Sequence, residues 1–234
     1  MSWWRRSKAE KLESFPAFEV PFRMLRHIRL TPTVFGFLSL FAGISILVVS
    51  QAILPLDEAI MEWAGPRRSA ELIDWMLLAS YMADTTPIVI LGVGISVLLW
   101  RLAGRRVALA LLLGGGIGEL FYTFAKWAFQ RPRPQILEHL SSAGWHAYPS
   151  GHTTLSVIII SLAFVLLADA LPRLRHLFWA VAILVPICVA ISRVGLGVHY
   201  PSDVVGGLAL GWAWLFWWRD WSRRPTTSSS AETA

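Results

Sequence analysis

The stretch LFWAVAILVPICVAISRVGLGVHYPSDVVGGLALGWAWLFWW, residues 177–218, places ionisable side chains between two long apolar runs. The segment between the runs carries Arg193, His199 and Asp203. Apolar runs of this kind are typical of membrane helices, in which ionisable groups are costly and usually functional. The stretch therefore predicts two membrane helices with a functional site in the connection between them.

The composition of the whole chain supports a membrane protein. Of the 234 residues, 55% are apolar and only 15% are charged, and the mean hydropathy is +0.54. A soluble domain has about 25% charged residues. The net charge of +6 could suggest nucleic acid as a partner, but the basic residues are scattered between apolar runs without a basic face rich in stacking aromatics. Phospholipid head groups explain this charge better, and no nucleic-acid partner is expected.

The apolar runs predict an all-α, polytopic membrane protein with six transmembrane helices. A span needs about 20 mostly apolar residues. The six predicted spans cover residues 32–54, 82–100, 106–126, 153–171, 176–192 and 203–218. Two pairs of small residues, Gly114-x3-Gly118 and Gly207-x3-Gly211, predict close packing between these helices.

The remaining segments flank or interrupt this six-span domain, which covers residues 32–218. Residues 1–31 mix Lys and Arg with Trp and Phe, which predicts a segment at the membrane interface. Residues 55–81 mix acidic and apolar residues, which suggests a short helix on the membrane surface. Residues 219–234 form a basic tail whose end has too little apolar surface to fold, so we expect it to be disordered.

The distribution of basic residues predicts the orientation in the membrane. If the N-terminus is cytoplasmic, 15 of the 21 Lys and Arg residues lie on the cytoplasmic side and six on the outer side. This asymmetry fits the positive-inside rule and predicts that both termini are cytoplasmic. Four of the six outer cations nevertheless fall in two short loops, 126–151 and 192–203, which also hold three of the six His residues, and His152 directly follows the first loop. An anion bound at the outer face of a bacterial cytoplasmic membrane would explain this concentration.

The residue types in these loops suit a phosphate group. Lys126, Arg133 and Arg193 supply three positive charges for a group that carries about −1.5 to −2 charges. Ser150 and Gly151 stand where the fourth span begins, and unpaired N–H groups at a helix start favour an anion. These five residues are the predicted phosphate ligands.

Three further residues suit nucleophilic catalysis. His199 and Asp203 lie four residues apart, so the carboxylate can reach one imidazole nitrogen and orient the ring. The other nitrogen of His199 is then free to attack phosphorus. His152 comes from another span and is the candidate to protonate the leaving oxygen and then to activate water.

Taken in order, these residues form three motifs: Lys126-x6-Arg133-Pro134, Pro149-Ser-Gly-His152 and Ser192-Arg-x5-His199-x3-Asp203. The motifs resemble the three signatures of the type 2 phosphatidic acid phosphatase superfamily, and the likeness covers about residues 32–218. The resemblance implies a phosphatase that needs no metal or other cofactor, with a phosphohistidine on His199 and with His152 as the acid and then the base. The phosphate ligands it implies are Lys126, Arg133, Ser150, Gly151 and Arg193.

Other functions fit the sequence less well. The haloperoxidases that share these motifs are soluble, whereas this chain has spans, and a transporter would need a polar path through the membrane. A structural protein would have no use for the Lys, Arg, His and Asp set. Cys188 is the single cysteine, so a multi-cysteine metal site is excluded. A phosphotransferase that uses the same histidine stays open, as do any protein partners.

The substrate is the least determined property. The loops are short, so we expect a lipid that adds binding energy through its chains. Arg131 lies beside the first motif and could contact a second phosphate, which favours undecaprenyl diphosphate. Phosphatidylglycerol phosphate, phosphatidic acid and the phosphates of lipid A are the alternatives. Glu119 within the third span and His146 in the outer loop have no assigned role.

Overall fold

The computed structural model describes residues 31–144 and 146–223. All regular secondary structure in these ranges is helical. The predictions for residues 1–30 and 224–234 lie outside the described residues. In chain order the elements are α3 (Pro32–Val49), α4 (Leu54–Ala64), the 3-10 turn η1 (Gly65–Arg67), α5 (Ala70–Tyr81), α6 (Thr85–Ala103), α7 (Arg105–Phe129), α8 (Gly151–Leu155), the π-helical η2 (Ser156–Ser161), α9 (Leu162–Ala170), the 3-10 turn η3 (Pro172–Leu174), α10 (Arg175–Gly195) and α11 (Pro201–Ser222).

Five helical segments in the described ranges are long and apolar enough to cross a membrane. They are Pro32–Val49, Thr85–Ala103, Arg105–Phe129, Gly151–Ala170 and Pro172–Gly195. Each corresponds to one of the first five predicted spans. The sixth predicted span becomes α11, which has 22 residues but is not among the five. Its sequence is rich in Trp and Gly, which lower the mean hydropathy, so its length alone marks it as a candidate.

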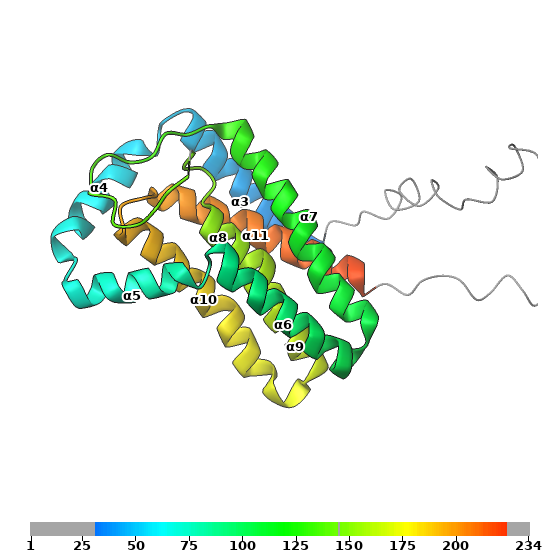
Figure 1. Cartoon of the computed structure of the whole chain (residues 1–234). Helices are drawn as coiled ribbons and strands as arrows, with labels where there is room; N and C mark the ends of the chain where they lie inside the picture. Colours follow the sequence, from blue (N-terminus) through cyan, green and yellow to red (C-terminus); the bar gives the residue numbers. More distant parts are fainter. Residues whose placement is uncertain (1–30, 145, 224–234) are drawn as a thin grey trace, which may run out of the picture. The chain divides into compact units, whose positions relative to one another are not determined.

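The region predicted as one surface helix, 55–81, forms two helices instead. A 3-10 turn at Gly65–Arg67 separates α4 from α5. Pro66 has no N–H with which to continue the hydrogen bonds of α4, and Ser69 starts α5 by accepting a hydrogen bond from the Leu72 N–H at 3.3 Å. Figure 1 shows α4 and α5 at the same end of the helical bundle as the long connection between α7 and α8.

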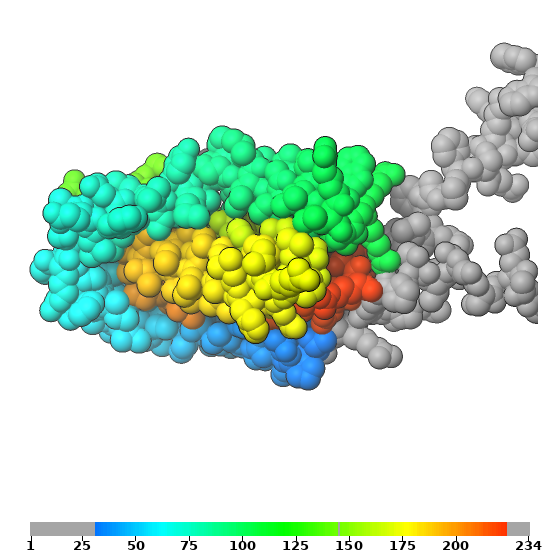
Figure 2. Space-filling view, turned by 90° about the horizontal axis from the view of Figure 1, so that it is seen from below, coloured from blue at the N-terminus to red at the C-terminus, as the bar shows by residue number. Residues whose placement is uncertain are grey.

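The run from α8 through η2 to α9 is the central helix of the bundle. Of an 18-residue apolar stretch within this run, 72% of the residues are buried. The corresponding share is 17–39% in the other four candidate spans. Figure 2 shows an outer face on which α10 lies between the green helices α6 and α7 and the blue helix α3. The exposed side chains of α10 include Leu184 and Ile191, so this face suits contact with lipid chains.

Both predicted glycine pairs lie at close helix contacts, which confirms the packing prediction. A Cβ on Gly118 would lie 2.7 Å from Trp214 Nε1, and one on Gly211 would lie 2.7 Å from Val157 Cβ. The absence of side chains at these positions lets α7 and α11 approach their neighbours. The indole of Trp214 also donates a hydrogen bond to the Gly114 carbonyl at 3.0 Å, so the contact between α7 and α11 is specific as well as close.

Candidate active site

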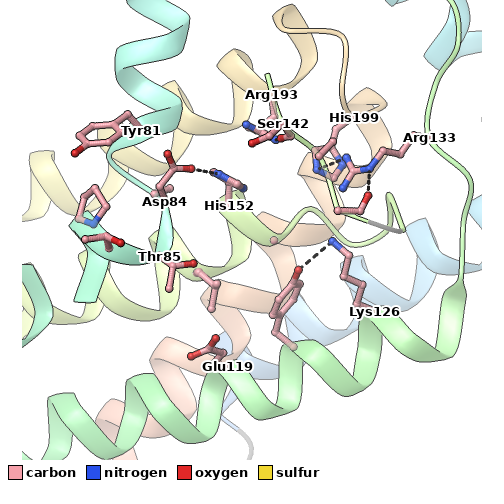
Figure 3. Close-up of a pocket in the computed structure, with 18 residues that line it drawn as sticks. Tyr81, Asp84, Thr85, Glu119, Lys126, Arg133, Ser142, His152, Arg193 and His199 are labelled. Carbon is pink, nitrogen blue, oxygen red and sulfur yellow. Dashed lines mark hydrogen bonds and ion pairs between the residues drawn. The ribbon is translucent and has the colours of Figure 1, made fainter. Parts of the chain in front are cut away.

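A cavity of about 890 Å³ opens at the end of the bundle that carries the three motifs. The first turn of α6, the last turns of α7, the 130–150 segment, the start of α8 and the end of α10 contribute to its wall. Figure 3 shows the lining side chains converging from these elements. The predicted residues on the wall are Lys126, Arg133, Gly151, His152, Arg193 and His199. Residues from three distant parts of the sequence therefore meet in one cavity.

Arg133 and His199 are in direct contact. Arg133 Nη1 lies 3.2 Å from His199 Nε2 and donates to the Val198 carbonyl at 2.6 Å. Since a guanidinium can only donate, this contact places a lone pair on Nε2 and the ring proton on Nδ1. His199 is 1% exposed, yet it lines the cavity. The structure therefore presents an unprotonated nitrogen of His199 to the cavity.

The surroundings of His199 keep its ring neutral. Burial lowers the pKa of His199 well below its ordinary value, and the nearby positive charges of Arg133, Arg193 and Lys126 lower it further. A neutral imidazole is the nucleophilic form. The same cations that would hold a phosphate thus also keep the histidine ready to attack it.

Arg193 is held in place by neighbours but keeps one donor unused. Its Nη1 donates to Ser80 Oγ at 2.5 Å and to Ser141 Oγ at 3.2 Å, and its Nη2 donates to the Ser142 carbonyl at 3.2 Å. Its Nε is buried and has no hydrogen-bond partner among the described residues. Because a buried unsatisfied donor is costly, a ligand oxygen in the cavity would stabilise this arrangement.

Lys126 and Gly151 both lie next to the hydroxyl group of Tyr122. Lys126 Nζ donates to Tyr122 Oη at 3.1 Å, and a Cβ at residue 151 would overlap that same hydroxyl. Ser150, in contrast, is not among the residues that line the cavity. It is fully buried, and its Oγ accepts a hydrogen bond from Thr153 Oγ1 at 3.1 Å. Among the predicted phosphate ligands, Ser150 is the one that the fold places behind the wall.

Asp203 lies behind His199, where the four-residue spacing predicts it. Its Oδ2 is 3.4 Å from His199 Nδ1 and accepts from the Tyr200 N–H at 2.8 Å. Its Oδ1 accepts from Arg131 Nη1 at 2.6 Å. Helix α4 holds Arg131 from the other side, because Arg131 Nη2 contacts Asp57 Oδ2 at 2.9 Å. The carboxylate that faces the histidine is therefore fixed by a buried ion pair.

These contacts correct the role that the sequence suggested for Arg131. Both terminal nitrogens of its guanidinium are bound to buried carboxylates, and Arg131 is not among the residues that line the cavity. Held in this way and outside the cavity wall, Arg131 is not placed to contact a second phosphate in the cavity. The two acids that hold it come from parts of the chain 74 and 72 residues away, so the sequence alone did not reveal the pairing.

Two acidic residues near the site were missed by the sequence analysis. Asp84 Oδ1 lies 2.7 Å from His152 Nε2, and Asp57 also accepts from the Ser202 N–H at 2.8 Å. The sequence indicated each of them only weakly. Asp84 stands near the start of a predicted span, and Asp57 lies in the 55–81 segment that mixes acidic and apolar residues. Glu119, which had no assigned role, lines the inner part of the cavity.

His139 and His146, in the segment between α7 and α8, do not line the cavity. His139 Nε2 contacts the Pro134 carbonyl at 2.8 Å, and the His146 carbonyl accepts from Arg133 Nη2 at 3.2 Å. Within residues 31–144 and 146–223, no group of three or more His, Cys, Asp or Glu side chains could hold a metal ion.

Comparisons with known proteins agree with this site. Residues 103–226 match the PAP2 superfamily. Phosphatidylglycerophosphatase B of Bacillus subtilis is 29% identical over 179 residues, which cover 73% of this chain and 85% of the relative. An undecaprenyl-diphosphatase of Sulfolobus acidocaldarius is 37% identical over 118 residues, which cover 47% of this chain and 52% of the relative. The crystal structure of a transmembrane PAP2-type phosphatidylglycerolphosphate phosphatase from Bacillus subtilis superposes with a TM-score of 0.76 and 25% identity, and the match covers 81% of this chain and 96% of that one.

Proposed function

Because the chain belongs to the PAP2 superfamily and is a multi-pass membrane lipid phosphatase, we propose that it cleaves its substrate through a phosphohistidine on His199. The observation that carries this proposal is the unprotonated Nε2 of His199, which lines a cavity together with Lys126, Arg133 and Arg193. A phosphate held by these three cations lies next to the nitrogen that attacks it.

In the first step, the lone pair of His199 Nε2 forms a bond to phosphorus while the bond from phosphorus to the lipid oxygen breaks. Asp203 stabilises the positive charge that develops on the ring. His152, which lines the same cavity, donates a proton to the leaving lipid oxygen. In the second step, His152 takes a proton from water, the water oxygen attacks phosphorus, and the P–N bond breaks to release inorganic phosphate.

Arg193 and Arg133 bind the transferred group in both steps. The unpartnered Nε of Arg193 supplies a donor that is already positioned, so little reorganisation is needed when charge develops on the phosphoryl oxygens. Lys126 adds a mobile positive charge. The Gly151 N–H at the start of α8 is the fourth donor that we assign to the phosphate, and Ser150 supports it from behind the wall.

We propose a glycerol-based lipid phosphate, of the phosphatidylglycerol phosphate type, as the preferred substrate. Beyond the cations, the cavity is lined by Thr85, Thr86 and Glu119, whose oxygens suit the hydroxyl groups of a glycerol head group. The likeness to phosphatidylglycerophosphatase B over most of both chains supports this choice. The sequence favoured a diphosphate because Arg131 could contact a second phosphate. The structure removes this reason, because Arg131 is held in ion pairs.

Undecaprenyl diphosphate is the second candidate, and the Sulfolobus relative supports it. A phosphate-release panel on the purified protein in detergent, with kcat/KM measured for each lipid, decides between the two. A tenfold preference in kcat/KM corresponds to about 1.4 kcal/mol of transition-state stabilisation. A preference of that size for undecaprenyl diphosphate would overturn our choice of substrate but not the phosphatase mechanism.

The nucleophile is tested by His199→Asn, with His139→Asn as the matched control outside the cavity. We expect His199→Asn to lose all measurable turnover and to form no acid-labile phosphoenzyme, while the control keeps the wild-type rate. Retention of activity by folded His199→Asn would show that another group attacks phosphorus.

We also propose that α11 is a sixth span and that the site faces the outer side of the membrane. Its 22 residues are long enough to cross a bilayer, and the 15 to 6 division of basic residues supports the orientation. The test uses Gln135→Cys on the site side and Leu174→Cys on the opposite side, both in a Cys188→Ala background. A maleimide that cannot cross membranes should label position 135 in intact cells and leave position 174 unlabelled, and the reverse pattern would refute the orientation.

A further inference from the structure

A second pair of histidine and carboxylate faces the first across the cavity. His152 Nε2 lies 2.7 Å from Asp84 Oδ1, whereas the first pair joins His199 to Asp203. Figure 3 shows His152 between Asp84 on one side and the cluster of His199 and Arg133 on the other. The imidazole therefore turns one nitrogen to Asp84 and its opposite side to the place where phosphate would bind.

Asp84 occupies a position at which aspartate normally has a different task. It is the N-cap of α6, with extended backbone angles (φ −66°, ψ 153°), but its side chain makes no capping hydrogen bond. A capping side chain usually stabilises a helix by about 0.5–2 kcal/mol. The carboxylate thus leaves its local partner and contacts a histidine 68 residues away, which indicates a task beyond starting the helix.

We propose that Asp84 is a positioning residue for His152, and that it sets which nitrogen of the imidazole exchanges the proton in the reaction. This inference rests on the phosphatase mechanism proposed above. With Asp84 as its acceptor, Nε2 keeps its proton throughout the cycle. The proton that moves is then the one on Nδ1. It passes to the leaving lipid oxygen in the first step, and Nδ1 takes a proton back from water in the second.

The carboxylate also supports the charged form of His152 that the first step needs. The charged side chains that line the cavity with His152 include Lys126 on α7 and Arg193 on α10, which are both cations and disfavour a protonated ring. Asp84 on α6 is the anion that opposes them. Without this anion, no negative charge in contact with His152 would oppose the two cations, and the protonated ring that supplies the leaving oxygen would be disfavoured.

The test compares two substrates that differ in their need for a proton. One is a long-chain alkyl phosphate, whose alkoxide must be protonated as it leaves. The other is a nitrophenyl phosphate with an alkyl tail, whose phenolate leaves without a proton. For Asp84→Asn we expect kcat/KM to fall about 100-fold with the alkyl substrate, the size of a general-acid contribution, and less than about threefold with the aryl substrate.

This variant separates positioning from capping, because Asn is as good an N-cap as Asp. Asp84→Ser provides a second variant with the same property if Asp84→Asn does not fold. Asp74→Asn, an exposed aspartate on α5, is the matched control and should keep both rates. Equal losses with both substrates would overturn the proposal, since a merely structural role does not distinguish leaving groups.

A second readout does not depend on activity. In ¹⁵N-histidine spectra of the wild type, neutral His152 should carry its proton on Nε2, and Asp84→Asn should change the proportion of the two tautomers. A wild-type protein that cleaves neither substrate would refute the proposed function, and the spectra would then still decide the role of Asp84. An Nδ1–H tautomer in the wild type would refute the positioning role.

Discussion

The buried triad of Asp57, Arg131 and Asp203 allows the stability of the site to be tested by changing its central cation. The side chains of the two acids are 2% and 0% exposed and that of the arginine is 9% exposed, and the ion-pair distances are 2.9 and 2.6 Å. Arg131→Gln would leave two carboxylates facing each other in a buried site. Removing one partner of a buried ion pair costs about 3–5 kcal/mol, and we expect a loss of stability in that range.

A double variant gives the sharper form of this prediction. Adding Asp57→Asn to Arg131→Gln removes one of the two uncompensated charges, so the double variant should be more stable than Arg131→Gln alone. For side chains in direct contact, the stability loss of a double variant differs from the sum of the two single losses by about 0.5–3 kcal/mol. Here we expect the double variant to lose less stability than that sum. Turnover should fall about tenfold in Arg131→Gln, because Asp203 loses the group that fixes its Oδ1 and aligns it with His199.

The assay is unfolding of the purified protein in detergent by an increasing fraction of SDS, combined with phosphate release below the transition. Arg173→Gln, an exposed arginine at the opposite end of the bundle, controls for loss of a positive charge. The reasoning is refuted if Arg131→Gln unfolds within about 1 kcal/mol of the wild type. It is also refuted if the losses of the two single variants simply add up in the double variant.

Three further predictions concern packing, protonation and metal ions. Gly118→Ala should destabilise the protein by about 1–3 kcal/mol, because its Cβ would lie 2.7 Å from both Ile158 and Trp214; Gly116→Ala, with nothing within 4 Å of its Cβ, should be neutral in the same unfolding assay. Burial and nearby cations lower the pKa of His199, so its ring should stay neutral as the pH falls through about 6.5, where an ordinary histidine is half protonated. Below that pH the unfolded chain binds a proton that the folded chain does not, so His199 lowers the stability as the pH falls. A ¹⁵N-histidine titration, with His199→Asn to assign the signal, checks this, and half protonation of His199 at pH 6.5 would contradict it. Lys126, Arg133 and Arg193 supply the charge that a bound metal would otherwise provide, so phosphate release should survive excess EDTA, and a complete loss restored by Mg²⁺ would contradict this mechanism.

The sequence by itself determined the class of protein and six of the residues that line the cavity. Apolar runs of sufficient length predict membrane helices because the bilayer leaves the backbone few other ways to satisfy its hydrogen bonds, and the first five predicted spans match helices that meet this criterion. The three motifs depend on spacings within a few residues, such as the four-residue step from His199 to Asp203. At a helix start, local backbone geometry alone brings residues with such a spacing into contact, so the contact can be predicted without the rest of the fold.

The tertiary structure decided which acidic residues serve the site. Asp84 meets His152 across 68 residues of chain, and Asp57 meets Arg131 across 74. No local rule connects residues so far apart, because their contact depends on how separate helices pack. The same packing turned Arg131 away from the cavity and placed Ser150 behind its wall. Sequence spacing determines contacts along one helix, whereas the pairing of buried charges depends on which helices become neighbours, since each buried charge must find a partner there.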